Sequence, residues 1–184
     1  HLPRSDSDST IQSQSGGSQQ TLGALLTENG QPHILLVDDE DMVLTSIKAF
    51  LQLETEYTIH GFNDPQDAIQ HLQTNPVDVV ISDYLMPRMN GIQMLGKAKE
   101  LQPEAARVLL TGHADKQSAI TAINDVGLYQ YLEKPWDNAQ LLLVINSAIE
   151  RTQLLRKLRD KVNELDAAHG NLKDVQSRLL RAFL

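Results

Sequence analysis

The sequence predicts an α/β fold in which helices cover both faces of a five-stranded parallel sheet. Short apolar segments alternate strictly along the chain with segments whose apolar residues recur at helical spacing. Apart from "YTIHGF", the apolar segments are nearly continuous, as is typical of central parallel strands that are buried on both faces. Together these two patterns indicate βαβ units with right-handed crossovers.

The five strands are expected at the segments "HILLV", "YTIHGF", "VDVVIS", "ARVLLT" and "LYQYLE", which are residues 33–37, 57–62, 77–82, 106–111 and 128–133. The connecting segments 41–53, 65–74, 91–101 and 115–126 are expected to be helices. The first of these shows the spacing well, with Val43, Ile47, Phe50 and Leu51 on one helical face.

The two ends of the chain differ from this alternating region. Residues 1–31 are rich in Ser, Gln, Gly and Asp, and we expect a flexible leader because so few apolar groups cannot offset the entropy of ordering. A last helix is expected to begin near Asp137, a suitable N-cap, and no proline follows to end it. The sequence thus predicts a leader (1–31), one globular domain (32–152) and a helical extension (153–184).

The extension has a heptad pattern. Position d holds leucine throughout, at Leu158, Leu165, Leu172 and Leu179, whereas position a holds Leu155, Val162, His169, Gln176 and Phe183. The first turns of this helix, around Leu141, are expected to pack on the globular domain. Beyond Leu155 the stripe predicts a parallel homodimeric coiled coil, although His169, Gly170 and Gln176 weaken the seam.

Composition excludes several classes of function. The 184-residue chain carries a net charge of −8 and 41% hydrophobic residues, which is unlike a protein that binds nucleic acid over its whole surface. It has no cysteine, so disulfides and thiolate metal sites are excluded. No apolar run approaches the roughly 18 residues that span a bilayer, and we expect a cytoplasmic protein with no membrane partner.

Ionisable residues follow the predicted strands where their carboxyl ends meet. Asp38 and Asp39 follow the first strand, Asp83 the third, Thr111 ends the fourth and Lys134 follows the fifth. Ligands of open parallel sheets bind at this edge. Clustered acids repel one another unless a cation compensates, and carboxylate oxygens suit Mg²⁺. A metal-assisted phosphoryl site is therefore expected, although any one of these aspartates, taken alone, could equally be a helix or turn cap.

Four motifs, "LLVDDE", "VVISDYLMPRMNG", "VLLTGH" and "YQYLEKPW", together resemble the receiver domain of two-component response regulators. The resemblance implies the flavodoxin-like strand order 2-1-3-4-5 and Asp83 as phosphoacceptor. It also implies that Mg²⁺, or Mn²⁺ in its place, is held by Asp83, by Asp39 directly, by Asp38 largely through water, and by the backbone carbonyl of Leu85. Further implied features are phosphoryl binding by Thr111 and Lys134, a switch made by Thr111 and Tyr131, and a cis Lys134–Pro135 peptide.

The expected partner is a histidine kinase or phosphotransfer protein, and the expected output passes through the last helix to an effector that is absent or removed. The effector could be an HD-type phosphodiesterase, a nucleotide cyclase, a phosphatase or a DNA-binding domain. Two other readings stay open. One is a stand-alone dimeric adaptor. The other is a Mg²⁺-dependent phosphatase of similar fold, although such enzymes generally carry a second aspartate where this chain has Leu85.

Overall fold

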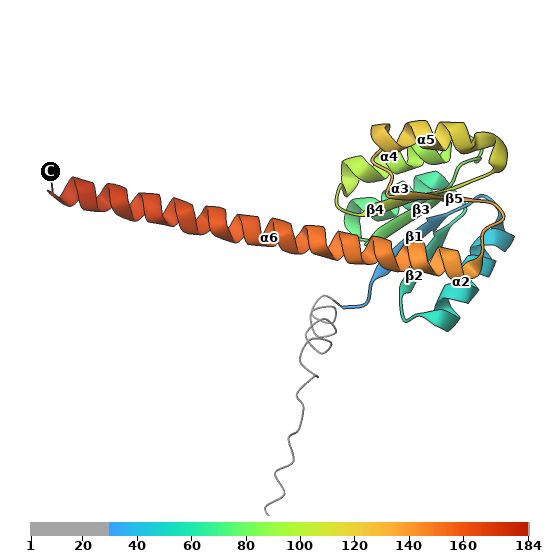
Figure 1. The fold of residues 1–184 in the computed structure, drawn as a ribbon, viewed down its shortest axis with the longest axis horizontal. Coiled ribbons are helices and arrows are strands. Elements are labelled where there is room, and N and C mark those ends of the chain that lie inside the picture. Colours follow the sequence, from blue (N-terminus) through green and yellow to red (C-terminus); the bar gives the residue numbers. More distant parts are fainter. Residues whose placement is uncertain (1–29, 184) are drawn as a thin grey trace, which may run out of the picture. The chain divides into compact units, whose positions relative to one another are not determined.

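The computed structural model describes residues 30–183, and the predicted leader lies outside them except for its last two residues. Five parallel strands form one sheet in the order β2-β1-β3-β4-β5, as predicted (Figure 1). The strands are β1 (His33–Val37), β2 (Thr58–Phe62), β3 (Val79–Asp83), β4 (Ala106–Thr111) and β5 (Gln130–Glu133). All are pairwise parallel, so their carboxyl ends lie along the same edge.

Helices cover both faces of the sheet. One face is covered by α2 (Asp41–Glu54) and the first part of α6 (Asn138–Phe183), and the other by α3 (Pro65–Thr74), α4 (Gly91–Leu101) and α5 (Lys116–Asp125). Alternate residues of β1, β3 and β4 supply the two cores, so Ile34 and Leu36 face α2 and α6 whereas Leu35 and Val37 face α3. This burial on both sides explains the continuous apolar strands.

Capping residues mark the starts of α3, α4 and α6. Asp64 accepts a hydrogen bond from the N–H of Gln66, with Pro65 at the first helical position of α3. Asn90 and Gln93 form a reciprocal capping box at α4. Asp137 accepts from the N–H of Ala139 at the start of α6, as predicted. A short 3-10 turn, η1 (His113–Asp115), which the sequence patterns did not indicate, precedes α5.

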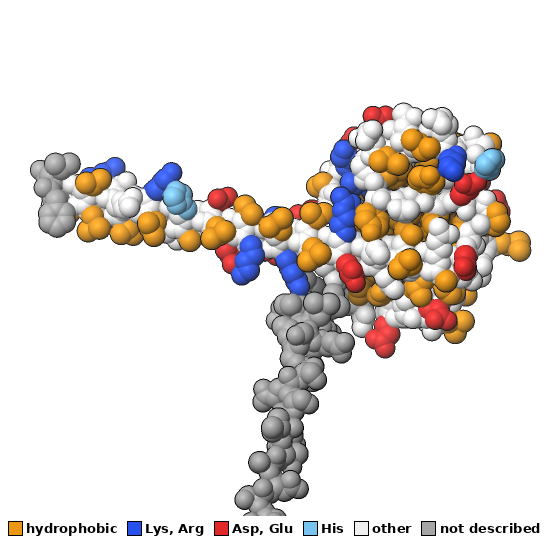
Figure 2. Space-filling view, viewed as in Figure 1, with side chains coloured by type: hydrophobic (Ala, Val, Ile, Leu, Met, Phe, Trp, Pro, Cys, Tyr) orange, Lys and Arg blue, Asp and Glu red, His pale blue; other side chains and the backbone are white. Residues whose placement is uncertain are grey.

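Helix α6 continues as one helix past the sheet (Figure 1). Its inward face is buried as far as Thr152 and Gln153, and every residue from Leu158 to Ala182 is exposed. The six predicted seam residues are all exposed, with between 40% and 69% of their surface accessible. These are Leu155, Leu158, Val162, Leu165, Leu172 and Leu179, and hydrophobic side chains form a row along the helix in Figure 2. No helix in residues 30–183 has the length and hydropathy needed to span a membrane.

Side chains fasten α6 to the amino ends of the central strands. The Thr152 hydroxyl donates to the carbonyl of Asp78 at 2.9 Å. The Arg156 guanidinium bonds the Asp78 carboxylate at 2.6 Å and the Val77 carbonyl at 2.7 Å. Arg159 pairs with Glu104 at 2.5 Å. We call Asp78, Glu104, Thr152, Arg156 and Arg159 the α6 clasp; it lies at the end of β3 opposite to Asp83.

Candidate functional site

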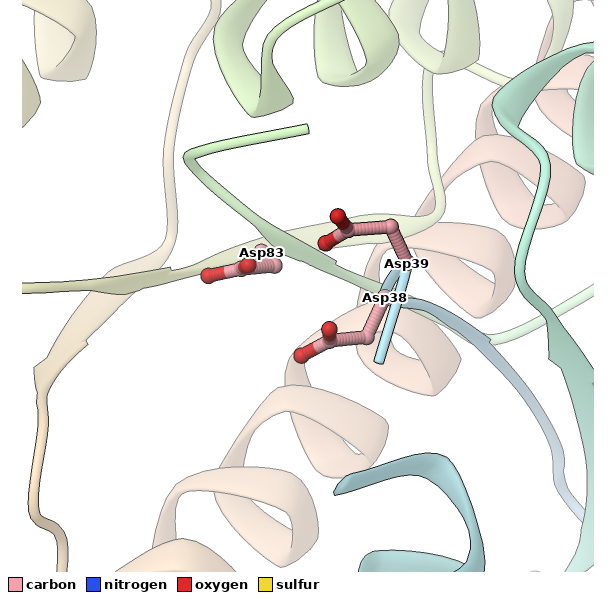
Figure 3. A group of neighbouring side chains, drawn as sticks. All are labelled: Asp38, Asp39 and Asp83. Atoms are coloured by element: carbon pink, nitrogen blue, oxygen red, sulfur yellow. The ribbon is translucent and has the colours of Figure 1, made fainter. Parts of the chain in front are cut away.

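Three aspartates converge at the carboxyl edge of the sheet. Asp38 and Asp39 follow β1 and Asp83 ends β3, and their carboxylates extend to the same side (Figure 3). One oxygen from each lies within 4.8 Å of the others. Asp38 and Asp83 are buried, at 0% and 4% exposure, whereas Asp39 is exposed. The cluster is therefore half enclosed, with one carboxylate open to solvent.

Burial dominates the electrostatics of Asp38. It raises the pKa of Asp38 from 3.8 to about 6; the hydrogen bond from the N–H of Glu40 opposes the rise, and the nearby charge of Asp83 adds to it. Oxygen Oδ1 accepts that N–H at 2.9 Å, whereas Oδ2 is buried with no hydrogen-bond partner. The nearest cation to Oδ2 is the Lys134 ammonium at 4.0 Å. Asp38 thus presents to the site one oxygen that has no hydrogen bond and is only partly compensated by Lys134.

Lys134 follows β5 and reaches across the edge to Asp83. Its Nζ lies 2.8 Å from Asp83 Oδ1, which also accepts the N–H of Tyr84 at 3.0 Å. Burial raises the pKa of Asp83 although Lys134 opposes it. Burial alone would lower the pKa of Lys134, but the hydrogen bond and charge of Asp83 hold that pKa above its ordinary value. The Lys134–Pro135 peptide is cis, which confirms that prediction.

Thr111 and Tyr131 come from the strands next to β3. Thr111 ends β4, is fully buried, and donates its hydroxyl to the Gly112 carbonyl at 3.2 Å. The Thr111 carbonyl accepts the N–H of Lys134, which ties β4 to the lysine loop. Tyr131 lies on β5 and is partly buried against the core beneath α3, α4 and α5. Leu85 has an exposed side chain, 64% accessible, in the loop after β3.

One constraint was not recognised from the sequence, where Gly91 was only the first residue of the expected helix 91–101. A Cβ atom at Gly91 would lie 2.1 Å from the Asp83 carbonyl oxygen and 2.8 Å from Leu109 Cδ1. Only glycine permits α4 to begin this close to the end of β3. The signal available in the sequence was glycine directly after the capping residue Asn90, where α4 starts.

A second feature that the sequence did not predict is a polar network formed by residues that adjoin Thr111 and Lys134 in the chain. Glu133 pairs with His113 at 2.5 Å and with Lys116 at 3.7 Å, which joins β5 to η1 and α5. The hydrogen bond from His113 is the main reason why the pKa of Glu133 is lowered. The network thus links the end of β5 to the segment that follows Thr111.

Comparison with known families agrees with this geometry. The family model for the response regulator receiver domain matches residues 34–146. The chain belongs to the response regulator receiver family. Receivers are signalling domains. The match confirms the family that the four sequence motifs resemble, and the observed sheet confirms the predicted fold class and strand order.

Individual receivers are moderately similar. The hydrogenase transcriptional regulatory protein HoxA of Bradyrhizobium diazoefficiens is 29% identical over 147 residues, which is 80% of this chain and 30% of HoxA. The receiver domain of an HD domain-containing protein from Pseudomonas fluorescens Pf-5 is 38% identical, with TM-score 0.63 over 66% of this chain and 97% of that one. An adenylate cyclase structure from Rhodopirellula baltica is 25% identical, with TM-score 0.69 over 72% of this chain and 98% of that one. The chain spans less than a third of the length of HoxA.

Proposed function

We propose that this receiver accepts a phosphoryl group on Asp83 and relays that state through α6. The observation that carries the proposal is the contact between Asp83 and Lys134, 2.8 Å apart, beside the buried acids at the same edge. A carboxylate can act as a nucleophile at phosphorus when neighbouring cations offset the charge of the transferring group. The absence of a second acid at Leu85 favours a phosphoacceptor over the phosphatase reading.

The acidic cluster fits Mg²⁺. The buried Oδ2 of Asp38, which has no hydrogen-bond partner, and the close oxygens of Asp39 and Asp83 form a set of hard ligands. We assign the ion to Asp39 and Asp83, with Asp38 acting largely through water and the Leu85 carbonyl completing the protein ligands; Mn²⁺ could replace it. When bound, Mg²⁺ neutralises charge on the phosphoryl oxygens.

The transfer step follows from these positions. An Asp83 carboxylate oxygen attacks phosphorus in line with the donor. As the new P–O bond forms, the P–N bond of a phosphohistidine breaks, and its electron pair returns to the imidazole nitrogen, which is protonated. Lys134 supplies a positive charge to one phosphoryl oxygen, and the Thr111 hydroxyl donates to another after leaving the Gly112 carbonyl. The donor is a histidine kinase or a phosphotransfer protein.

Acetyl phosphate labelling tests this function. Wild-type protein with Mg²⁺ should form an acid-labile phosphate, and Asp83→Asn should abolish it. Asp125→Asn is the matched control because it neutralises an exposed acid at the far end of α5. Failure of the wild type to label, with small donors and with cognate kinases, would overturn the proposal.

We assign the response to Thr111 and Tyr131. Both residues lie on strands that end at the site, and the Tyr131 side chain on β5 is only partly buried. Movement of the Thr111 hydroxyl to the phosphoryl group releases space into which the ring turns. This alters the surface of α4, β5 and α5, which partner segments would contact.

Output through α6 is supported by its exposed apolar row. We propose that residues 32–152 form the receiver and 153–184 a parallel coiled-coil helix that pairs two copies and leads to an effector. The six seam residues are exposed in the single chain, and pairing would remove them from water. The α6 clasp fixes the helix against the sheet, so a shift within the receiver would be transmitted along a continuous helix.

Cysteine crosslinking tests the dimer, since the chain has no cysteine of its own. Leu165→Cys places identical d residues opposite each other in a parallel pair and should crosslink readily. Ala167→Cys, two residues away at position f, should not. Equal crosslinking of the two variants, or none, would contradict the dimer. An unchanged yield along 155–184 after addition of beryllium fluoride would contradict the coupling alone.

The effector stays one of the four classes expected from the sequence: an HD-type phosphodiesterase, a nucleotide cyclase, a phosphatase or a DNA-binding domain. Proteins that carry similar receivers are described as transcriptional regulators, an HD domain-containing protein and an adenylate cyclase. We place the protein in the cytoplasm, where kinases deliver the phosphoryl group. Expression of the whole gene product, followed by assays for DNA binding, cyclase and cyclic-nucleotide phosphodiesterase activity, would distinguish these outputs from a stand-alone adaptor.

A further inference from the structure

Three histidines that the sequence separates lie in series beneath α3 at the β2 edge of the sheet. His33 begins β1, His60 lies on β2, and His71 lies near the end of α3. The strand register pairs His33 with Thr58 and Leu35 with His60, which puts both rings on the side of the sheet that α3 covers. No sequence pattern indicates this cluster, because its spacings of 27 and 11 residues match no common ligand motif.

The first two rings already present nitrogens to each other. Nδ1 of His33 and Nε2 of His60 are 3.0 Å apart, and the ring planes differ by 12°. In a tetrahedral zinc site, bonds of about 2.05 Å place two ligand nitrogens about 3.3 Å apart. The separation of this pair is therefore close to that required of two ligands of one ion.

The third ring carries an unexplained polar atom. The His71 ring centroid lies 4.6 Å from that of His60, and its Nδ1 side faces the Asn75 amide at 3.4 Å. Its Nε2 is buried and has no hydrogen-bond partner. Leaving such a group unpaired is unfavourable, and an ion or water is the usual reason for it.

We propose that His33, His60 and His71 form a binding site for a first-row transition-metal ion such as Zn²⁺, separate from the carboxylate cluster. Imidazole nitrogens suit Zn²⁺, Ni²⁺ and Cu²⁺, whereas the oxygens of the aspartates suit Mg²⁺. The two sites therefore select different ions. The site is independent of the phosphoacceptor function and stands or falls without it.

Closing the site requires one movement. In residues 30–183 the aspartates are the only acidic or histidine group of three whose ligand atoms all lie within 4.8 Å. The His71 ring must therefore turn its free Nε2 toward the His33–His60 pair, and a water completes the four ligands. Burial, then the neighbouring His71 and His33, lower the pKa of His60, and the proton of the His33–His60 hydrogen bond must move to another ring nitrogen when the ion binds. The charge of Lys48 lowers the pKa of His60 further.

Zinc titration of the full chain tests the site. The protein is held in saturating Mg²⁺ to occupy the aspartates, and binding is followed by calorimetry and by the ¹H–¹⁵N signals of the histidine rings. One Zn²⁺ should bind, shifting the three ring signals and raising Tm. His71→Ala should weaken binding at least tenfold, and His60→Gln should abolish it. The control replaces the other histidines, His1, His113 and His169, and should bind as the wild type does.

Tm in EDTA verifies that each variant is folded, and His71→Asn serves as a second variant if His71→Ala is not. The proposal is overturned if His71→Ala binds Zn²⁺ with wild-type affinity, or if the control variant loses binding. It is equally overturned if Zn²⁺ leaves the three ring signals and Tm unchanged, which would assign the buried Nε2 to a water.

Discussion

Replacing Asp38 by Asn should stabilise the metal-free protein. Asp38 is fully buried, its Oδ2 has no hydrogen-bond partner, and its pKa is raised from 3.8 to about 6, mainly by burial. The folded state therefore holds the proton more tightly than the unfolded chain does. Asparagine keeps the oxygen that accepts the Glu40 N–H but carries no charge at any pH.

The magnitude follows from linkage. A rise of about 2 pKa units at about 1.4 kcal/mol per unit makes the ionised carboxylate cost up to about 3 kcal/mol of folding free energy. Because the folded-state pKa is the higher one, this cost is absent below pH 3.8, grows as pH rises toward 6, and is constant above that. Asp38→Asn should thus gain about 3 kcal/mol at pH 7.5 and about half as much at pH 5.

Urea unfolding in EDTA at several pH values between 5 and 8 measures this. Glu54→Gln neutralises an exposed acid at the end of α2 and should change the free energy of unfolding by about 0.5 kcal/mol or less. Saturating Mg²⁺ should narrow or reverse the difference in unfolding free energy between Asp38→Asn and the wild type, because only the wild type keeps the full ligand set. A gain below about 1 kcal/mol at pH 7.5, or an equal gain at pH 5, would refute the reasoning.

Three further variants probe the surroundings of the site. Gly91→Ala should destabilise the fold by about 2 kcal/mol in urea unfolding and slow phosphorylation, because its Cβ would meet the Asp83 carbonyl. The control is Gly96→Ala in the same helix. Its Cβ would lie at an ordinary 3.6 Å from Val126, so this variant should be neutral or stabilising. Arg156→Met should cost about 2 kcal/mol by leaving the Asp78 carboxylate unpaired, and adding Asp78→Asn should restore much of it; failure of that rescue would contradict the clasp. Leu85→Gln should shorten the phosphate lifetime by admitting water, and an unchanged half-life would count against this role.

Much of the fold followed from local patterns. The predicted strands agree with the observed ones to within about two residues at each end, because buried parallel strands impose continuous apolar runs such as Val79–Ile81. The position of the candidate site could also be predicted from the sequence, since parallel strands bring residues at their carboxyl ends to one edge. Asp38, Asp39, Asp83, Thr111 and Lys134 all lie at that edge, and their chemical roles remain predictions.

Contacts between side chains or backbone of distant segments could not be predicted from the sequence. The contact of Gly91 with the Asp83 carbonyl depends on the angle between β3 and α4. The α6 clasp joins residues 55 to 78 positions apart, and a lone Asp78 among apolar residues carries no sign of its arginine partner.

The sequence by itself determined the alternation of strands and helices, the edge where the ionisable residues gather and the apolar row along α6, because each of these follows from periodicity within one segment. Only the tertiary structure decided which oxygen of Asp38 is left unpaired, how α6 is fastened to the sheet, and that His33, His60 and His71 lie together. The physical reason is that hydrogen bonding, burial and strand register depend on neighbours from distant segments, which no local pattern specifies.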